Sequence, residues 1–221
     1  MPTMSQRLFS TGLWIEGCFS FAFVKEQHVL TNNVVEGLER FLRGKRLFIS
    51  ILFDTAVFGF LIPALFIFLS RKLDGIFHMP RYDPLFLKVL GFFLVLLGIT
   101  LIMWAYYLLV RVGKGYTLEF FGKGVLPVTE RLVTVGPYSK VRHPMALGHL
   151  IMLLGIAFAI NSLSGVFVLF PLILFASCLY LKFFEEKALG ERFKEEYDEY
   201  RENTNFLIPW FKKRKKSRLK R

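Results

Sequence analysis

The chain has 221 residues, of which 54% are hydrophobic and 26 are phenylalanine, and its mean hydropathy is +0.46. Several apolar runs are long enough to cross a bilayer, which excludes an ordinary soluble domain of this size. The net charge of +12 lies mostly outside those runs, and much of it is in the tail Lys212–Arg221. Such a tail suits anionic membrane lipids, and because no nucleic-acid-binding motif accompanies it, we expect no nucleic-acid partner.

The amino-terminal segment, residues 1–46, contains one apolar stretch, Leu8–Val24. It is short, includes Glu16 and has no small-residue cleavage site, which argues against a signal peptide. The composition leaves two alternatives open, a marginal span or an interfacial helix.

Residues 47–110 predict two transmembrane helices. Leu47–Ser70 is long enough to cross, and Leu85–Val110 is the cleanest apolar run in the chain. Asp54 is the only ionisable residue deep within either run, and Pro63 lies in the same helix as Asp54.

Residues 111–221 begin with a long loop and continue with a helical hairpin. The loop, Gly113–Pro144, contains Gly113 and Gly115, which either form turns or let backbone amides approach a ligand. Two further apolar runs, Ala146–Ile160 and Val166–Phe184, are separated only by Asn161–Gly165, which predicts a tight hairpin. Cys18 and Cys178 lie in apolar surroundings without metal-ligand spacing, so we expect neither a disulfide nor a metal site.

Lys and Arg are distributed unevenly between the loops. Arg40–Arg46, Arg111–Arg142 and the tail are rich in them, whereas the hairpin turn has none and Arg71–Pro84 has few. The positive-inside rule therefore predicts that the tail, the Gly113–Pro144 loop and the end of the hairpin lie on the cytoplasmic face.

A helix is predicted over Glu185–Arg201, with one apolar stripe formed by Leu189, Phe193, Tyr197 and Tyr200. Either it lies on the headgroups, or it folds back over the Gly113–Pro144 loop and covers a pocket. The second alternative gives a reason for the Glu185–Glu186 pair at the membrane boundary, since carboxylates there are costly unless they are paired or bind a ligand.

The most informative stretch is Leu132–Gly148, which reads L-V-T-V-G-P-Y-S-K-V-R-H-P-M-A-L-G. Together with the later E-E-x-x-L-x-x-x-F-x-x-x-Y-x-x-Y pattern, it resembles the isoprenylcysteine carboxyl methyltransferase family and its phospholipid-methyltransferase-like relatives, over about the last 110 residues. The resemblance implies a cytoplasmic-face pocket for S-adenosylmethionine and a lipid substrate from the bilayer. It implies cofactor contacts from Glu130, Arg131, Leu132, Val133, Tyr138, His143, Pro144, Met145, Ala146 and Glu186.

The chemistry of S-adenosylmethionine is compatible with these residue types. The cofactor needs acceptors for its ammonium and ribose hydroxyls, donors for its carboxylate, an apolar wall for adenine, and negative or π surroundings for the sulfonium. We expect Arg142 and Glu185 to act in the transfer, with Arg142 orienting an acceptor carboxylate. The alternative for Arg142 is a headgroup anchor, and the alternative for His143 is a hydrogen-bonded interfacial side chain.

The chain departs from the family pattern at three places. Ala146 stands where an aromatic is common, Phe193-Lys194 stands where the family has Phe-Gly, and Lys182 is the counterpart of an Arg that would bind the substrate with Arg142. The acceptor is therefore either a prenylated cysteine carboxylate or an amine-bearing lipid.

The sequence thus predicts an all-α, polytopic membrane methyltransferase. Two alternatives stay open at this point. One is an NADPH-dependent membrane reductase related to sterol reductases, and the other is a non-enzymatic scaffold or transporter.

Overall fold

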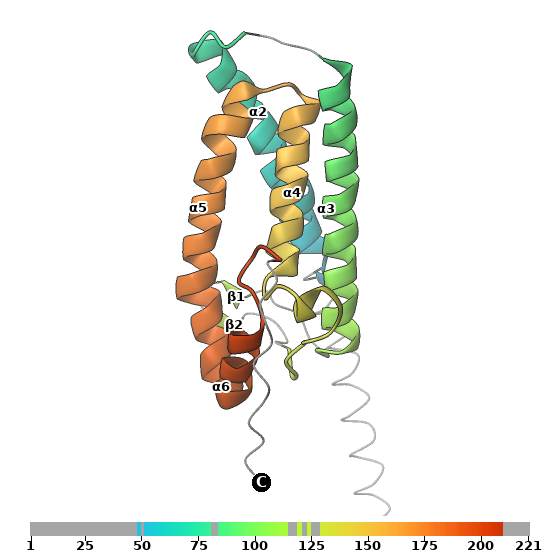
Figure 1. Cartoon of the computed structure of the whole chain (residues 1–221), viewed down its shortest axis with the longest axis vertical. Helices are drawn as coiled ribbons and strands as arrows, with labels where there is room; N and C mark the ends of the chain where they lie inside the picture. Colours follow the sequence, from blue (N-terminus) through green and yellow to red (C-terminus); the bar gives the residue numbers. More distant parts are fainter. Residues whose placement is uncertain are drawn as a thin grey trace, which may run out of the picture. The chain divides into compact units, whose positions relative to one another are not determined.

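The computed structural model describes residues 48–49, 51–80, 84–114, 119–120, 123–124 and 129–209, and most of them are helical (Figure 1). The Leu8–Val24 stretch, Cys18, the Arg40–Arg46 cluster, Gly115 and the basic tail from Lys212 lie outside the described residues.

The first two predicted spans are confirmed. A π-helical segment, η1 (Thr55–Leu61), leads directly into α2 (Ile62–Ile76), and α3 (Leu85–Arg111) follows. The wider π-helical turn lies just before Pro63, which lacks an amide hydrogen and would clash with the preceding turn of a regular α-helix. The predicted end at Ser70 is wrong, because α2 continues through Arg71 and Lys72. Both are good helix formers whose long side chains extend to solvent.

The third helix, α4 (Pro144–Ala159), packs along α3 through glycines (Figure 1). Gly98 of α3 faces Gly148 of α4, and one heptad away Gly91 faces Gly155. A Cβ atom at Gly98 would lie 2.6 Å from the Gly148 carbonyl oxygen, and one at Gly91 would lie 2.5 Å from that of Gly155. Small residues at these positions let the two backbones touch, as is typical of helix pairs in membranes.

A long helical path follows the turn after α4. It consists of η3 (Gly165–Leu169), α5 (Phe170–Tyr180), η4 (Leu181–Glu185) and α6 (Glu186–Asn203). The predicted uninterrupted helix from Glu185 to Arg201 is wrong at Lys194, where φ is +48° and the path kinks. The spacing of the apolar stripe did not reveal this kink, because side chains on either side of it still pack inward after the chain changes direction.

Three helices in the described part of the chain are long and apolar enough to cross a membrane, namely Ile51–Ile76, Leu85–Arg111 and the Gly165–Asn203 path. The predicted span Ala146–Ile160 is instead the 16-residue α4, which is shorter than the usual spanning length and is largely buried among its neighbours. Bulky side chains such as Phe60, Phe93 and Phe175 are exposed on the first, second and third of these paths, as expected of surfaces that face lipid. A short antiparallel pair, β1 (Glu119–Phe120) and β2 (Lys123–Gly124), completes the described elements. Apart from this pair the described elements are helical, so the predicted all-α membrane fold class is confirmed.

The turn between α4 and α5 is fastened to the carboxyl-terminal part of α2. The Ser164 amide donates to the Asp74 carboxylate at 2.9 Å, and the Gly165 amide donates to Ser162 Oγ at 2.9 Å. These contacts cap the start of the helical path. They hold the end of the bundle at which α4 finishes, which is opposite to the end at which α4 begins at Pro144 (Figure 1).

Candidate functional site

The motif before α4 forms a compact turn against α3. Gly136 has a φ of +61°, and a Cβ atom there would lie 2.7 Å from Leu108 Cδ1, so the position requires glycine. A 3-10 turn, η2 (Gly136–Ser139), then buries Tyr138 beside Leu109 and Val133. Burial, together with the nearby Glu185 carboxylate, raises the pKa of Tyr138, so its side chain remains a neutral phenol.

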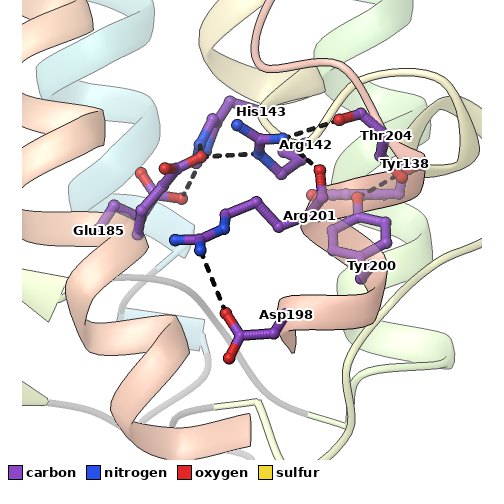
Figure 2. Close-up of polar contacts among 9 residues, drawn as sticks. Tyr138, Arg142, His143, Glu185, Asp198, Tyr200, Arg201 and Thr204 are labelled. Carbon is purple, nitrogen blue, oxygen red and sulfur yellow. Dashed lines mark hydrogen bonds and ion pairs between the residues drawn. The ribbon is translucent and has the colours of Figure 1, made fainter. Parts of the chain in front are cut away.

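Arg142 connects the motif to two later segments (Figure 2). Its Nε donates to Glu186 Oε1 at 2.7 Å, and its Nη1 donates to the carbonyl oxygens of Arg201 at 3.0 Å and Thr204 at 2.7 Å. The Arg142 and Glu186 side chains are only 10% and 11% exposed. Most of the guanidinium fork is thus occupied by contacts within the protein.

The segment after the Lys194 kink folds back over the motif. The Tyr200 hydroxyl donates to the Tyr138 carbonyl at 2.7 Å (Figure 2), and the Arg142 amide donates to the Asn205 carbonyl at 2.8 Å. The fold-back alternative is therefore confirmed for the part of the loop around Tyr138–Arg142. The kink makes it possible, because a straight helix would have continued away from the loop.

His143 lies between the two glutamates and is 3% exposed. Its Nδ1 is 3.3 Å from Glu185 Oε1, and its Nε2 is 3.6 Å from Glu186 Oε1. Burial disfavours the imidazolium, but the two carboxylates outweigh burial and raise the pKa of His143 to about 9. A protonated imidazole donates from both nitrogens, and among the described residues Nε2 has no hydrogen-bond partner.

A cavity of about 510 Å³ opens beside this cluster. Of the residues predicted to act in catalysis or cofactor binding, the following line it: Arg131, Leu132, Val133, Tyr138, Arg142, His143, Pro144, Met145, Ala146 and Glu185. The structure thus gathers residues from the motif and from the end of the hairpin around one hollow.

Four other candidates do not line the cavity, namely Glu130, Lys182, Glu186 and Gly113. Glu186 contacts Arg142 and His143 without lining the cavity, Lys182 is exposed, and Glu130 is exposed on the segment after the loop. The Gly113 carbonyl accepts the Glu130 amide at 2.8 Å, and a Cβ atom at Gly113 would lie 2.7 Å from the Leu109 carbonyl oxygen. These contacts support the turn alternative for Gly113.

The cavity also has lining residues that the motif did not indicate. Asp54 and Phe58 come from the first span, His149 from α4, and Ser177 and Tyr180 from α5. The available signal was the presence of Asp54 and His149 within apolar helices, where ionisable residues are uncommon and are often functional.

Comparison with known proteins gives one match. A family model described as phospholipid methyltransferase matches residues 86–196, which is half of the chain. The match begins within α3, earlier than the motif resemblance, and ends within α6. No curated protein and no solved structure matches the chain.

Proposed function

The chain belongs to the phospholipid methyltransferase family and is a membrane methyltransferase that acts on lipid-like substrates, and from this premise we propose that it takes the methyl group from S-adenosylmethionine. The acceptor would be a lipid-like molecule in the bilayer, either a prenylated cysteine carboxylate or an amine-bearing lipid. The family match favours this function over a reductase, scaffold or transporter.

The cavity has the size and residue types that S-adenosylmethionine requires. Its volume of about 510 Å³ lies within the usual range for small-molecule sites. Protonated His143 in the cavity wall offers a positive charge to the cofactor carboxylate, and Glu185 is an acceptor for its ammonium or ribose hydroxyls. Leu132, Val133 and Met145 offer an apolar wall for adenine. The aromatic lining residues Tyr138, Tyr180, Phe193 and Tyr200 offer π surfaces to a sulfonium.

The observation that carries the proposal is the His143–Glu185 pair in the wall of a largely apolar cavity. A buried imidazolium next to a carboxylate presents both charges that an amino-acid group needs, and each residue comes from one of the two sequence blocks. Arg142 and Glu186 fit a positioning role better than direct contact with a ligand, because their side chains form an ion pair with each other at 2.7 Å.

When bound, S-adenosylmethionine supplies an activated methyl group, and the protein has mainly to align the reactants. Transfer from a sulfonium is an in-line displacement, and well-oriented reactants lower such barriers by roughly 7–11 kcal/mol. His143 and Glu185 would fix the amino-acid end of the cofactor, and the apolar wall would exclude water from the reacting atoms.

Calorimetric titration of the purified protein with S-adenosylmethionine tests the proposal. Glu185→Gln should weaken binding by about tenfold or more, since it removes a charged acceptor while keeping the shape of the side chain. Glu191→Gln is the matched control, because Glu191 is exposed on the same helical path and does not line the cavity. Equal affinities in the two variants, or no binding by the wild-type protein, would contradict the proposal.

We also propose that the cavity faces the cytoplasm. The support is the concentration of Lys and Arg in the Arg111–Arg142 segment, which runs from the end of α3 to the start of α4 and includes residues that line the cavity.

A further inference from the structure

A short segment after α6, Thr204–Leu207, lies against the motif that precedes α4. Its backbone pairs with the motif, because the Arg142 amide donates to the Asn205 carbonyl at 2.8 Å and the Asn205 amide donates to the Lys140 carbonyl at 3.3 Å. The Thr204 carbonyl oxygen also accepts a hydrogen bond from Arg142 Nη1 at 2.7 Å (Figure 2). The segment is therefore fixed to both the backbone and the side chain of Arg142.

Phe206 has a defined position within this segment. The residue before it, Asn205, is held by the two backbone hydrogen bonds to the motif, and the residue after it, Leu207, is buried with Leu150 and Leu181. Phe206 itself is half-buried and packs against the same apolar cluster. Its ring is thus anchored from both directions along the chain.

The Phe206 ring contacts two consecutive residues of the motif. The guanidinium carbon of Arg142 lies over the ring, 5.6 Å from its centre. The His143 ring centre lies 5.1 Å from that of Phe206, and the two ring planes are inclined by 73°. These distances are typical of a cation–π contact and of an edge-to-face ring pair. One aromatic ring therefore touches both positively charged side chains of the cluster, since His143 is protonated.

Phe206 lies behind the wall of the cavity. Arg142 and His143 line the cavity, whereas Phe206 does not. A carboxylate in the place of Phe206 would neutralise the charge of its neighbours, but an aromatic ring attracts a cation through its π electrons and adds no charge. The ring can therefore hold two adjacent cations while the cavity wall keeps its positive charge. An aliphatic side chain of similar size would fill the same space without this attraction.

We propose that Phe206 is a positioning residue, whose ring holds the Arg142 and His143 side chains in place so that His143 faces the carboxylate of bound S-adenosylmethionine. This inference rests on the proposed function. It adds to the binding site a residue beyond position 196, where the match to the family model ends. The segment after α6 is then part of the binding machinery as well as a connection to the basic tail.

Two substitutions of Phe206 separate the aromatic ring from simple packing. Phe206→Met keeps an apolar side chain of similar size without a ring, and Phe206→Tyr keeps the ring. In calorimetric titrations of the full-length protein in nanodiscs, Phe206→Met should bind S-adenosylmethionine about fivefold or more weakly than wild type. Phe206→Tyr should bind it within about twofold of wild type. Phe183→Met is the matched control, because Phe183 is 61% exposed and does not line the cavity.

A second ligand shows whether the effect is specific to the amino-acid end of the cofactor. 5′-Methylthioadenosine has the adenine and ribose of S-adenosylmethionine but lacks the amino-acid group. Its affinity should stay within about twofold of wild type in Phe206→Met, because the proposed role of Phe206 concerns only the side chain that faces the carboxylate. A general loosening of the site would weaken both ligands alike. Thermal unfolding of the same samples shows whether each variant is folded.

Several results would overturn the inference. They are an unchanged affinity for S-adenosylmethionine in Phe206→Met, an equal loss in Phe206→Tyr, and an equal loss for the two ligands. Phe206→Leu gives the same comparison if Phe206→Met does not fold. Loss of folding in both aliphatic variants would also overturn the inference, because Phe206 would then act through the stability of the core.

The two proposals fail in different ways. If the wild-type protein does not bind S-adenosylmethionine, the proposed function is wrong and this inference falls with it. If the wild-type protein and Phe206→Met bind the cofactor equally well, the proposed function stands and the positioning role of Phe206 is wrong.

Discussion

Replacing Arg142 by Lys separates a positioning role from direct contact with the substrate. Lys keeps the positive charge beside Glu186, but a single ammonium on an unbranched stem cannot also reach the Arg201 and Thr204 carbonyl oxygens that Arg142 Nη1 contacts at 3.0 and 2.7 Å. The structure therefore predicts that Arg142→Lys loosens the segment after the Lys194 kink.

The magnitude follows from the two hydrogen bonds that Lys cannot make. A hydrogen bond to a charged group contributes about 1.5–3 kcal/mol, so the removal of both costs about 3 kcal/mol at the lower end of that range. Solvent does not reduce this free-energy cost, because the Arg142 side chain is only 10% exposed and there is little room for water to replace the guanidinium. Thermal or denaturant unfolding of the purified protein measures this destabilisation.

Trypsin gives a local measurement of the same change. The Arg201 carbonyl belongs to the peptide bond that trypsin would cleave after Arg201, and in the wild-type protein it accepts a hydrogen bond from Arg142. Cleavage at this bond should be faster in Arg142→Lys. Arg201→Lys is the matched control for stability, since that side chain is 53% exposed and its 3.4 Å ion pair with Asp198 should contribute only about 0.2–1 kcal/mol.

One pattern of results would refute this reasoning. If Arg142→Lys unfolds like the wild-type protein and is cleaved at the same rate, but loses tenfold or more in methyl transfer with cofactor binding retained, Arg142 contacts the acceptor. A tenfold loss corresponds to about 1.4 kcal/mol in the activation barrier.

Three further outcomes are expected. Gly98→Ala should destabilise the protein by about 2 kcal/mol in denaturant unfolding, because the new Cβ would lie 2.6 Å from the Gly148 carbonyl oxygen. Gly75→Ala, with no atom within 4 Å of its Cβ, should be neutral or stabilising, and similar effects of the two substitutions would contradict the packing argument. The raised pKa of His143 should stabilise the fold by about 3 kcal/mol below pH 6.5, and this contribution should be lost as pH rises through 9, so unfolding curves of wild type and His143→Gln should converge over that range. With Cys18 and Cys178 replaced by Ala, an impermeant thiol reagent should label Lys140→Cys and Gly75→Cys from opposite sides of the membrane, and labelling of both from one side would contradict the topology.

Much of the fold was predictable from composition and periodicity. Uninterrupted apolar runs identified α3 and the hairpin, because the hydrocarbon core of a bilayer imposes a minimum helix length that sequence reports directly. Likewise, the turn at Gly136 and the start of α4 at Pro144 depend on local backbone preferences. The motif also indicated most of the lining residues on that side of the cavity, since they are neighbours in the chain.

Tertiary structure decided the roles of the charged residues. Arg142 looked like a group free to orient a substrate, but the kink at Lys194 returns two carbonyl oxygens to its guanidinium. Neither the positive φ nor the resulting hydrogen bonds leave a periodic signal, because they depend on where the chain goes after the kink.

The opposing glycines, and the Asp54 and His149 side chains that line the cavity, show the same limit. Each glycine by itself is compatible with a flexible position or a weak helix, and only the approach of α4 to α3 shows that a Cβ atom would not fit. Asp54 and His149 are almost a hundred positions apart in the chain. The sequence by itself determined that this is a helical membrane protein with a methyltransferase motif at the amino end of α4. Only the packing of helices that are distant in sequence decided which side chains share the cavity, because contacts between distant segments leave no pattern in the local sequence.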